Sequence, residues 1–436
     1  MVRWKCEEKV EALYAGGSIL TSSIHKRHYK RPNTRAQSEK TSRTRDVQDL
    51  VFSSQDLAGL IFNRFMPPVG VSSNISKMTG VLQAEIPNFD ACRQSVDNIM
   101  FPALSTFPEV INLGKLLIQI STGINTSNHT CFPLLCTWMI KNKTELVQVQ
   151  TIRCNEFDLS DTSTNMNHFA NVVRSGALAS MTELDLGINQ IGDEGMKDFS
   201  SVLSSGALAS LTKLDLDQNK IGDEGMKAFS TALSRPSGSL ASLKELGLGS
   251  NQIGDEGMEA FSAALSSGAM GSLKELNFGA NKIGDEGMRA FSAALSRGAL
   301  ANLVDLRLGY NQIGNTGMIA FAHAIKCTDE PPVGVLQNLV TLGLSSNMIG
   351  ATGIGELSTA LSMSHDPLVL PSLGKLTMKL EVGVALELAV EELNAACEIR
   401  GISCGVHQEG DDGDDDEDGD DDEDGDDDED GDDDEV

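Results

Sequence analysis

The chain has 436 residues, 40% of them hydrophobic and only 5% aromatic, a composition typical of a folded protein with an aliphatic core. Its formal net charge is −29, but 22 carboxylates lie between Glu409 and Glu435, so the remainder carries only −7. The eight cysteines form no CxxC pair, which argues against a disulfide framework and a zinc module. No apolar run is long enough to cross a bilayer, which argues against a membrane-spanning protein. We expect a cytoplasmic or nuclear chain.

The first third of the chain contains no repeat. Residues 1–45 hold 11 Lys/Arg against 4 Glu, and we interpret them as a basic, disordered, solvated arm. A nuclear-localisation or nucleic-acid patch at His25–Arg35 is the alternative, which the lack of interleaved aromatic residues disfavours. Residues 46–146 are predicted to form a partly helical N-terminal region or cap, with Trp138 in its core. Its helix-like patterns are Val96–Ile120 and Leu134–Ile140.

Residues 147–382 repeat one pattern, L-x-x-L-x-L-x-x-N-x-I-G-D-E-G-M-x-x-F-S-x-x-L. The asparagines are 30, 32, 30, 30 and 36 residues apart: Asn189, Asn219, Asn251, Asn281, Asn311 and Asn347. The clear copies begin at Met181, Leu211, Leu243 and Leu273, and the weaker copies at Leu303 and Leu339. A degenerate first copy contains Val147, Ile152, Asn155 and Phe157. A last strand begins at Leu373, with Glu381 in the asparagine place.

Each part of the pattern has a physical task. Leu214 and Leu216 alternate with polar residues, as in a strand with one buried face. The asparagine satisfies backbone groups where the chain leaves the strand. Asp223 suits a helix N-cap, and the following Met, Phe, Ala and Leu lie on one apolar helical face. Strand, turn and helix therefore alternate, and neighbouring units must stack to bury their apolar sides.

The predicted fold is an α/β leucine-rich repeat solenoid, a curved horseshoe with parallel strands on the concave face and helices on the convex face. Residues 383–408 are predicted to form a C-terminal helical cap, mainly from the run Val384–Ile402. Residues 409–436 repeat Gly-Asp-Asp-Asp-Glu-Asp and are predicted to be a disordered acidic tail. The tail has three open roles: to bind a basic patch on a partner, to shield the basic arm, or to raise solubility.

The sequence contains no catalytic constellation, because the histidines share no motif with Cys, Ser or carboxylate partners. The IGDEG turns lack the GxxxxGK[ST] pattern of a phosphate loop and the spacing of an EF-hand, so helix capping explains them better. We therefore predict no enzyme activity, no metal and no cofactor, and a protein partner rather than a membrane, a nucleic acid or a small-molecule substrate.

Strand alternation also predicts which side chains point outward from the concave face. Before the last two strands these hold seven acids and two bases, which favours a basic partner. The predicted partner-binding residues are Glu183, Asp185, Lys213, Asp215, Asp217, Glu245, Glu275, Asn277, Asp305, Arg307 and Tyr310. Tyr310 is a candidate anchor, because aromatic residues are common in interface hot spots. The alternative is that these charges only keep an exposed sheet soluble.

The repeats resemble ribonuclease-inhibitor-like leucine-rich repeat proteins, and the acidic C-terminal extension adds a similarity to Ran GTPase-activating proteins. In that family the strand-to-helix turn typically reads Asp-Asn-Ala-Phe-Gly, and one turn asparagine assists GTP hydrolysis on Ran. The turns here read Asn-Gln-Ile-Gly, beginning at Asn189, Asn251 and Asn311, and Asn-Lys-Ile-Gly, beginning at Asn219 and Asn281. Asn and Gly match, but the Ala-Phe pair and the preceding Asp do not, so no asparagine is nominated as catalytic.

Three hypotheses follow. The first is a non-enzymatic interaction scaffold that uses an acidic concave face. The second, implied by the resemblance, is a GTPase-activating protein that positions the catalytic groups of a Ran-like small GTPase. The third, from a similarity to acidic leucine-rich nuclear phosphoproteins, is a histone-binding protein, which the long helical repeats disfavour.

Overall fold

A computed structural model describes eight ranges of the chain: 89–106, 109–124, 128–154, 162–235, 240–326, 335–362, 369–380 and 384–408. The predicted basic arm, residues 46–88 and the predicted acidic tail lie outside the described residues. So do Asn155, Phe157 and Glu381 from the degenerate repeat copies.

Ten parallel strands form one sheet, and their order in the sheet is their order in the chain. This arrangement confirms the predicted α/β leucine-rich repeat solenoid. The strands are β1 (Val110–Asn112), β2 (Thr151–Arg153), β3 (Glu183–Asp185), β4 (Lys213–Asp215), β5 (Glu245–Gly247), β6 (Glu275–Asn277), β7 (Asp305–Arg307), β8 (Thr341–Gly343), β9 (Lys375–Leu380) and β10 (Ser403–Gln408).

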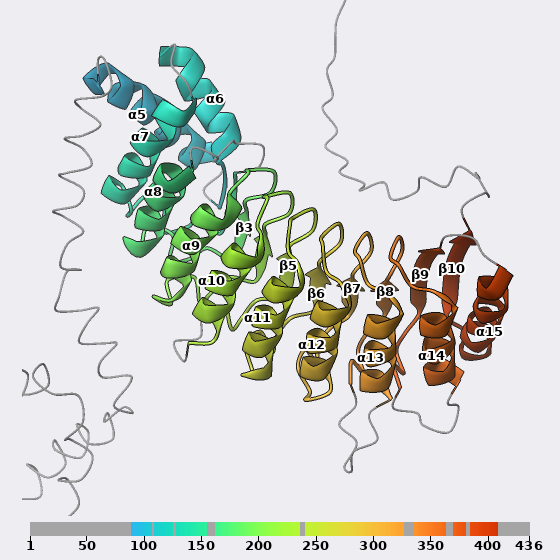
Figure 1. The fold of residues 1–436 in the computed structure, drawn as a ribbon. Coiled ribbons are helices and arrows are strands. Elements are labelled where there is room, and N and C mark those ends of the chain that lie inside the picture. Colours follow the sequence, from blue (N-terminus) through green and yellow to red (C-terminus); the bar gives the residue numbers. More distant parts are fainter. Residues whose placement is uncertain are drawn as a thin grey trace, which may run out of the picture. The chain divides into compact units, whose positions relative to one another are not determined.

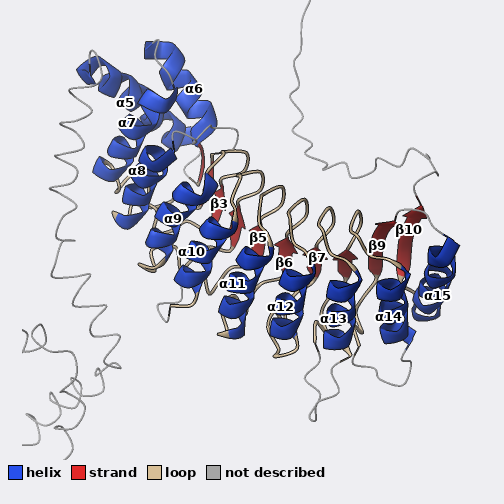
Figure 2. Ribbon diagram, viewed as in Figure 1, coloured by secondary structure: helices blue, strands red, loops and turns tan. Residues whose placement is uncertain are grey.

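The helices lie in a second row along the sheet, α8 to α15 side by side (Figures 1 and 2). They are α5 (Phe89–Thr106), α6 (Leu113–Ile124), α7 (Asn128–Lys141), α8 (Thr162–Arg174), α9 (Gly192–Leu203), α10 (Asp223–Leu233), α11 (Asp255–Ser266), α12 (Asp285–Leu295), α13 (Asn315–Ile325), α14 (Ala351–Ser362) and α15 (Val384–Arg400). None of these described helices has the length and apolarity needed to span a membrane.

One apolar interior runs through the stack. In α10 the predicted apolar face of Met226, Phe229, Ala232 and Leu233 is buried, as is Leu214 at the centre of β4. The same positions recur in the neighbouring repeats, and all of them join a single hydrophobic cluster. Because each unit buries its apolar side against the next, the interior is continuous from the N-terminal helices to α15.

The sheet extends further toward the N-terminus than the repeat pattern indicates. The helix-like pattern at Val96–Ile120 is not one helix, because β1 separates α5 from α6 and pairs with β2. The frame proposed for the first copy is also wrong. Val149 and Ile152 are buried, whereas Val147 is 62% exposed, so the leucine-like positions of β2 begin two residues later than predicted.

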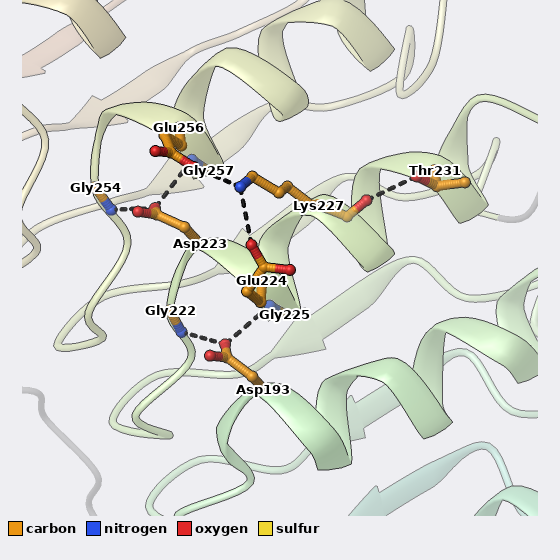
Figure 3. Close-up of polar contacts among 10 residues, drawn as sticks. All are labelled: Asp193, Gly222, Asp223, Glu224, Gly225, Lys227, Thr231, Gly254, Glu256 and Gly257. Atoms are coloured by element: carbon orange, nitrogen blue, oxygen red, sulfur yellow. Dashed lines mark hydrogen bonds and ion pairs between the residues drawn. The ribbon is translucent and has the colours of Figure 1, made fainter.

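The acidic turn residue caps a helix, but the helix belongs to the next repeat (Figure 3). The N-cap of α10 is Gly222, which makes no side-chain capping bond, and Asp223 is the first helical residue. The Asp223 Oδ1 atom instead accepts from the backbone N–H groups of Gly254 and Gly257, at 2.7 and 2.9 Å. This corrects the prediction that Asp223 caps its own helix.

Inter-repeat capping recurs along the stack and explains both glycines of the Gly-Asp-Glu-Gly motif. Asp193, Asp255 and Asp285 make the same two bonds to the following repeat, and Asn315 replaces them in the last one. A Cβ atom on Gly257 would lie 2.7 Å from Asp223 Oδ1, too close for any side chain. Each capping bond therefore also ties two repeats together.

The C-terminal end contains more than the predicted helical cap. After α15 the chain forms β10, which pairs with β9 over six residues. Arg400, the last residue of α15, donates from its Nη2 atom to the backbone oxygens of Val369 and Leu370, at 2.8 and 2.7 Å. The guanidinium thus satisfies carbonyls in the turn before β9 and fixes α15 on the preceding repeat.

Candidate functional site

The outward side chains of the strands form two rows across the sheet, which we call the strand face. The strands pair in register, so residues at the same strand position are neighbours about 4.8 Å apart. The first row runs Glu183, Lys213, Glu245, Glu275, Asp305, and the second runs Asp185, Asp215, Gly247, Asn277, Arg307. Asp217 and Tyr310 follow their strands at the carboxyl-end rim. The structure thus brings together all eleven residues predicted for partner binding on one surface.

The strand face carries an excess of negative charge. Lys213 Nζ lies 3.1 Å from Glu245 Oε2, and Arg307 Nη2 lies 3.2 Å from Asp305 Oδ2. From β3 to β7, these pairs use both bases and two of the seven acids. The acids in excess are Glu183, Asp185, Asp215, Asp217 and Glu275.

Bases border this acidic centre on both sides. Arg153 on β2 is in register with Asp185, and its side chain is exposed. Lys375 and Lys379 on β9 are exposed near the other end of the sheet. Sequence reasoning did not include Arg153 in the site, because it considered outward strand residues only from Glu183 onward. The strand face therefore has an acidic middle between two basic margins.

A hollow lies at the centre of the acidic region, where Gly247 interrupts the second row. It has an empty volume of ≈ 550 Å³ and is bordered by Asp215, Asp217, Glu275 and Asn277. A Cβ atom on Gly247 would lie only 2.8 Å from Asp217 Oδ1 and 3.1 Å from Asp215 Oδ1. Glycine at this position therefore leaves room for two carboxylates on one side of the hollow.

Hydrogen bonds fix Asp217 beside the hollow. Its Oδ1 atom accepts from the Gly249 backbone N–H at 2.5 Å, and its Oδ2 atom accepts from Asn277 Nδ2 at 3.1 Å. Burial and the repulsion of Asp215 nevertheless raise the pKa of Asp217 to about 6. Burial also raises the pKa of Glu275, with Glu245 and Asp305 adding repulsion. A cation entering the hollow would relieve this repulsion.

Three of the turns that follow the strands carry an exposed apolar side chain: Ile188, which is 43% exposed, Tyr310 and Met348. Tyr310 is 66% exposed, and its backbone, at φ 56°, donates to the Ser345 carbonyl at 2.7 Å. Met348, in the turn of the next repeat, is 70% exposed. Sequence reasoning missed Met348, although the five preceding copies have Gln or Lys at this place.

The asparagine ladder is bonded to the backbone rather than directed at a ligand. The Asn251 Nδ2 atom donates to the carbonyls of Leu216, Leu248 and Gly249, and its Oδ1 accepts from the N–H groups of Asn219 and Ile221. The other members likewise donate from Nδ2 to backbone carbonyls: Asn189, Asn219, Asn281, Asn311 and Asn347. The buried Asn189 Oδ1 differs, because it accepts no hydrogen bond from the described residues. The amide groups of the ladder hold the turns between neighbouring repeats.

The described ranges contain no group of three or more His, Cys, Asp or Glu residues arranged to hold a metal ion. The carboxylates of the Gly-Asp-Glu-Gly turns are engaged in inter-repeat capping and in ion pairs such as Lys227–Glu256 (Figure 3). The strand face is therefore the candidate site, and its chemistry suits the recognition of cationic groups.

Comparison with known proteins identifies the repeats. A family model described as leucine-rich repeat matches residues 177–200, 207–230, 239–262, 272–292 and 299–322. The matched segments cover the clear copies of the pattern and the first weaker copy. The chain therefore contains leucine-rich repeats, and the match does not single out the ribonuclease-inhibitor-like subclass.

No curated protein matches the chain. Among solved structures, the chain is similar to one in the crystal structure of the Rad7 and Elc1 complex from yeast. The identity is 12% and the TM-score is 0.25, and the alignment covers 75% of this chain and 93% of that chain.

Proposed function

We propose that this leucine-rich repeat protein is a non-enzymatic interaction scaffold that binds a protein partner with a basic surface on its strand face. Solenoids present extended surfaces of this kind, on which successive repeats contribute side chains to one binding site. The observation that carries the proposal is the hollow at Gly247, where Asp215, Asp217 and Glu275 gather without enough bases to neutralise them.

The proposed contact is an arginine or lysine side chain of the partner in this hollow. A guanidinium group donates several hydrogen bonds and suits a site with carboxylates on more than one side. The exposed Tyr310 and Met348 on the rim add apolar contact area near the cationic group. The basic margins, Arg153 on one side and Lys375 on the other, would favour a partner whose basic region is flanked by acidic residues.

Charge-matched variants of the full chain test this proposal. The strand-face variant carries Glu183→Gln, Asp215→Asn and Glu275→Gln, and the control carries Glu259→Gln, Glu391→Gln and Glu398→Gln on exposed helix positions. Both lose three negative charges and keep the acidic segment after residue 408. We expect immobilised wild-type and control proteins to retain the same salt-sensitive partners from a cell extract, and the strand-face variant to lose them. Equal retention by both variants would place the binding elsewhere.

The GTPase activator implied by the sequence resemblance is the alternative. Single-turnover GTP hydrolysis by a Ran-like GTPase, with and without this protein, separates the two. A GTPase activator accelerates hydrolysis by a factor of about 10³ or more. We expect no acceleration, and an effect of that size would replace the scaffold proposal.

A further inference from the structure

We propose a second binding site, in the N-terminal helices, for an acidic peptide segment that packs one apolar side chain against Phe101 in a cleft lined by Phe101 and Trp138. The site is a cleft between α5 and α7, outside the repeats and separate from the strand face. Its volume of ≈ 210 Å³ is smaller than a typical small-ligand pocket and suits one side chain.

The spacing of residues on two helices builds the cleft. Arg93, Asp97 and Phe101 are four residues apart and share one face of α5. Trp138 and Lys141 of α7 line the opposite side. The floor is apolar, since Val96, Leu134 and Trp138 are almost fully buried.

The aromatic pair forms a preorganised apolar wall of the cleft. The Trp138 Nε1 atom donates to Asp97 Oδ1 at 2.7 Å, which fixes the orientation of the indole. The Phe101 ring lies edge-to-face against it, with centroids 5.4 Å apart and an interplanar angle of 73°. Phe101 is 46% exposed, so its ring offers an apolar surface that a bound apolar group would cover.

The charges at the mouth select an anionic ligand. Within the described part of the chain, neither Arg93 nor Lys141 forms an ion pair. Burial lowers the pKa of Lys141 and repulsion by Arg93 adds to the shift, while attraction by the single carboxylate of Asp97 opposes it. The one acid in the cleft, Asp97, already accepts the indole N–H. Carboxylates on both sides of an inserted apolar side chain would neutralise both bases.

This chemistry distinguishes an external peptide from the chain's own acidic segment. The acidic tail, residues 409–436, has a single apolar side chain, Val436, which follows the acids and does not lie between them, so it does not match the cleft. The occupant that fits both features is a peptide of a partner protein with Leu or a similar residue among Asp or Glu.

Intrinsic fluorescence provides the test, because the chain has two tryptophans and a Trp4→Phe variant leaves Trp138 as the single reporter. The probe is a capped five-residue peptide with a central leucine between two pairs of aspartates. One control peptide has glycine at the centre, and a second has asparagines in place of the aspartates. We expect a saturable fluorescence change with the probe and at least about tenfold weaker binding of each control.

Cleft variants in the same Trp4→Phe background complete the test. Arg93→Ala and Lys141→Ala should each weaken binding about two- to fivefold, and Phe101→Ala about tenfold. The exposed Lys143→Ala, outside the cleft, is the matched control and should bind as the parent does. All these positions are at least partly exposed, so the variants should fold, which circular dichroism checks. No fluorescence change at millimolar probe, equal binding of the glycine control, or equal effects of Lys141→Ala and Lys143→Ala would overturn the proposal.

Discussion

Asp217 shows how one residue can link the charge of the strand face to pH. It faces Asp215 on its own repeat, Asn277 on β6 and Arg307 on β7, and burial and Asp215 raise its pKa to about 6. An unfolded aspartate has a pKa of about 3.9, so between about pH 4 and 6 the folded state holds a proton that the unfolded state has lost. Asp217 therefore destabilises the fold increasingly as the pH rises through this window, and the effect is complete above about pH 6.

Replacing this carboxylate should remove that pH dependence. In Asp217→Asn the amide oxygen can still accept from the Gly249 N–H, but the side chain no longer titrates. We expect the free energy of unfolding of the variant, relative to wild type, to rise between pH 4 and 6 and to level off above pH 6. Urea unfolding at half-unit pH steps measures this difference, with Glu183→Gln on the same face as control. A constant difference across the window would show that Asp217 has an ordinary pKa in the folded state.

At the scale of elements, the bond between one turn and the next helix holds the stack together. Asp223→Ala would leave the N–H groups of Gly254 and Gly257 without their acceptor at the start of α11. We expect a loss of about 1–2 kcal/mol in the free energy of unfolding, the usual effect of removing a helix cap. Urea unfolding checks the value, and the exposed neighbour Glu224→Ala is the control for charge.

The origin of that loss can be separated from a general effect of the turn. Amide hydrogen exchange should show faster exchange at Gly254 and Gly257, in the repeat after the substitution, than at Gly222 and Gly225. Faster exchange confined to Gly222 and Gly225 would instead support the original prediction that Asp223 caps its own helix.

Local sequence patterns predicted the features that each repeat forms by itself. They did not predict the features that depend on contacts with a neighbouring repeat. The strand rows followed from the alternation of leucines, because one buried residue fixes the outward direction of the next. The capping partner of Asp223 did not follow, since it lies 31 residues away in Gly254. Strands β1 and β10 were missed because their sequences, VIN and SCGVHQ, lack the leucine pattern and form by pairing with β2 and β9.

The same distinction applies to the candidate site. Its residues were predictable, because each one occupies an outward strand position. Its electrostatics were not, since the pKa of Asp217 depends on burial and on Asp215, and its hydrogen bonds depend on Asn277 and Gly249 two repeats and one repeat away. Phe101 and Trp138 show the same limit, because a cleft between two helices leaves no mark in either helix alone.

At the scale of the whole molecule, the repeats are nearly identical, so one repeat should be able to take the place of the next in the stack. Deleting residues 243–272 removes β5 and α11 and joins Ser242 to Leu273, which continues the pattern. Asp223 would then meet Gly284 and Gly287. The N–H groups of these two glycines now donate to Asp255, as those of Gly254 and Gly257 donate to Asp223. We expect a folded chain whose urea m-value is about a tenth lower, because the surface exposed on unfolding falls by about one repeat in ten.

A deletion that breaks the period is the matched control. Removing residues 243–257 takes away β5 but leaves most of α11, so the following leucines no longer face the interior, and we expect loss of cooperative unfolding by circular dichroism. The full-repeat deletion also removes Gly247 and closes the hollow, so the folded variant should lose the partners that the strand face binds. If the full-repeat deletion folds but no longer binds these partners, the stacking of the repeats does not depend on the binding site at Gly247. Unfolding of both deletions alike would mean that the repeats do not contribute through nearest neighbours alone.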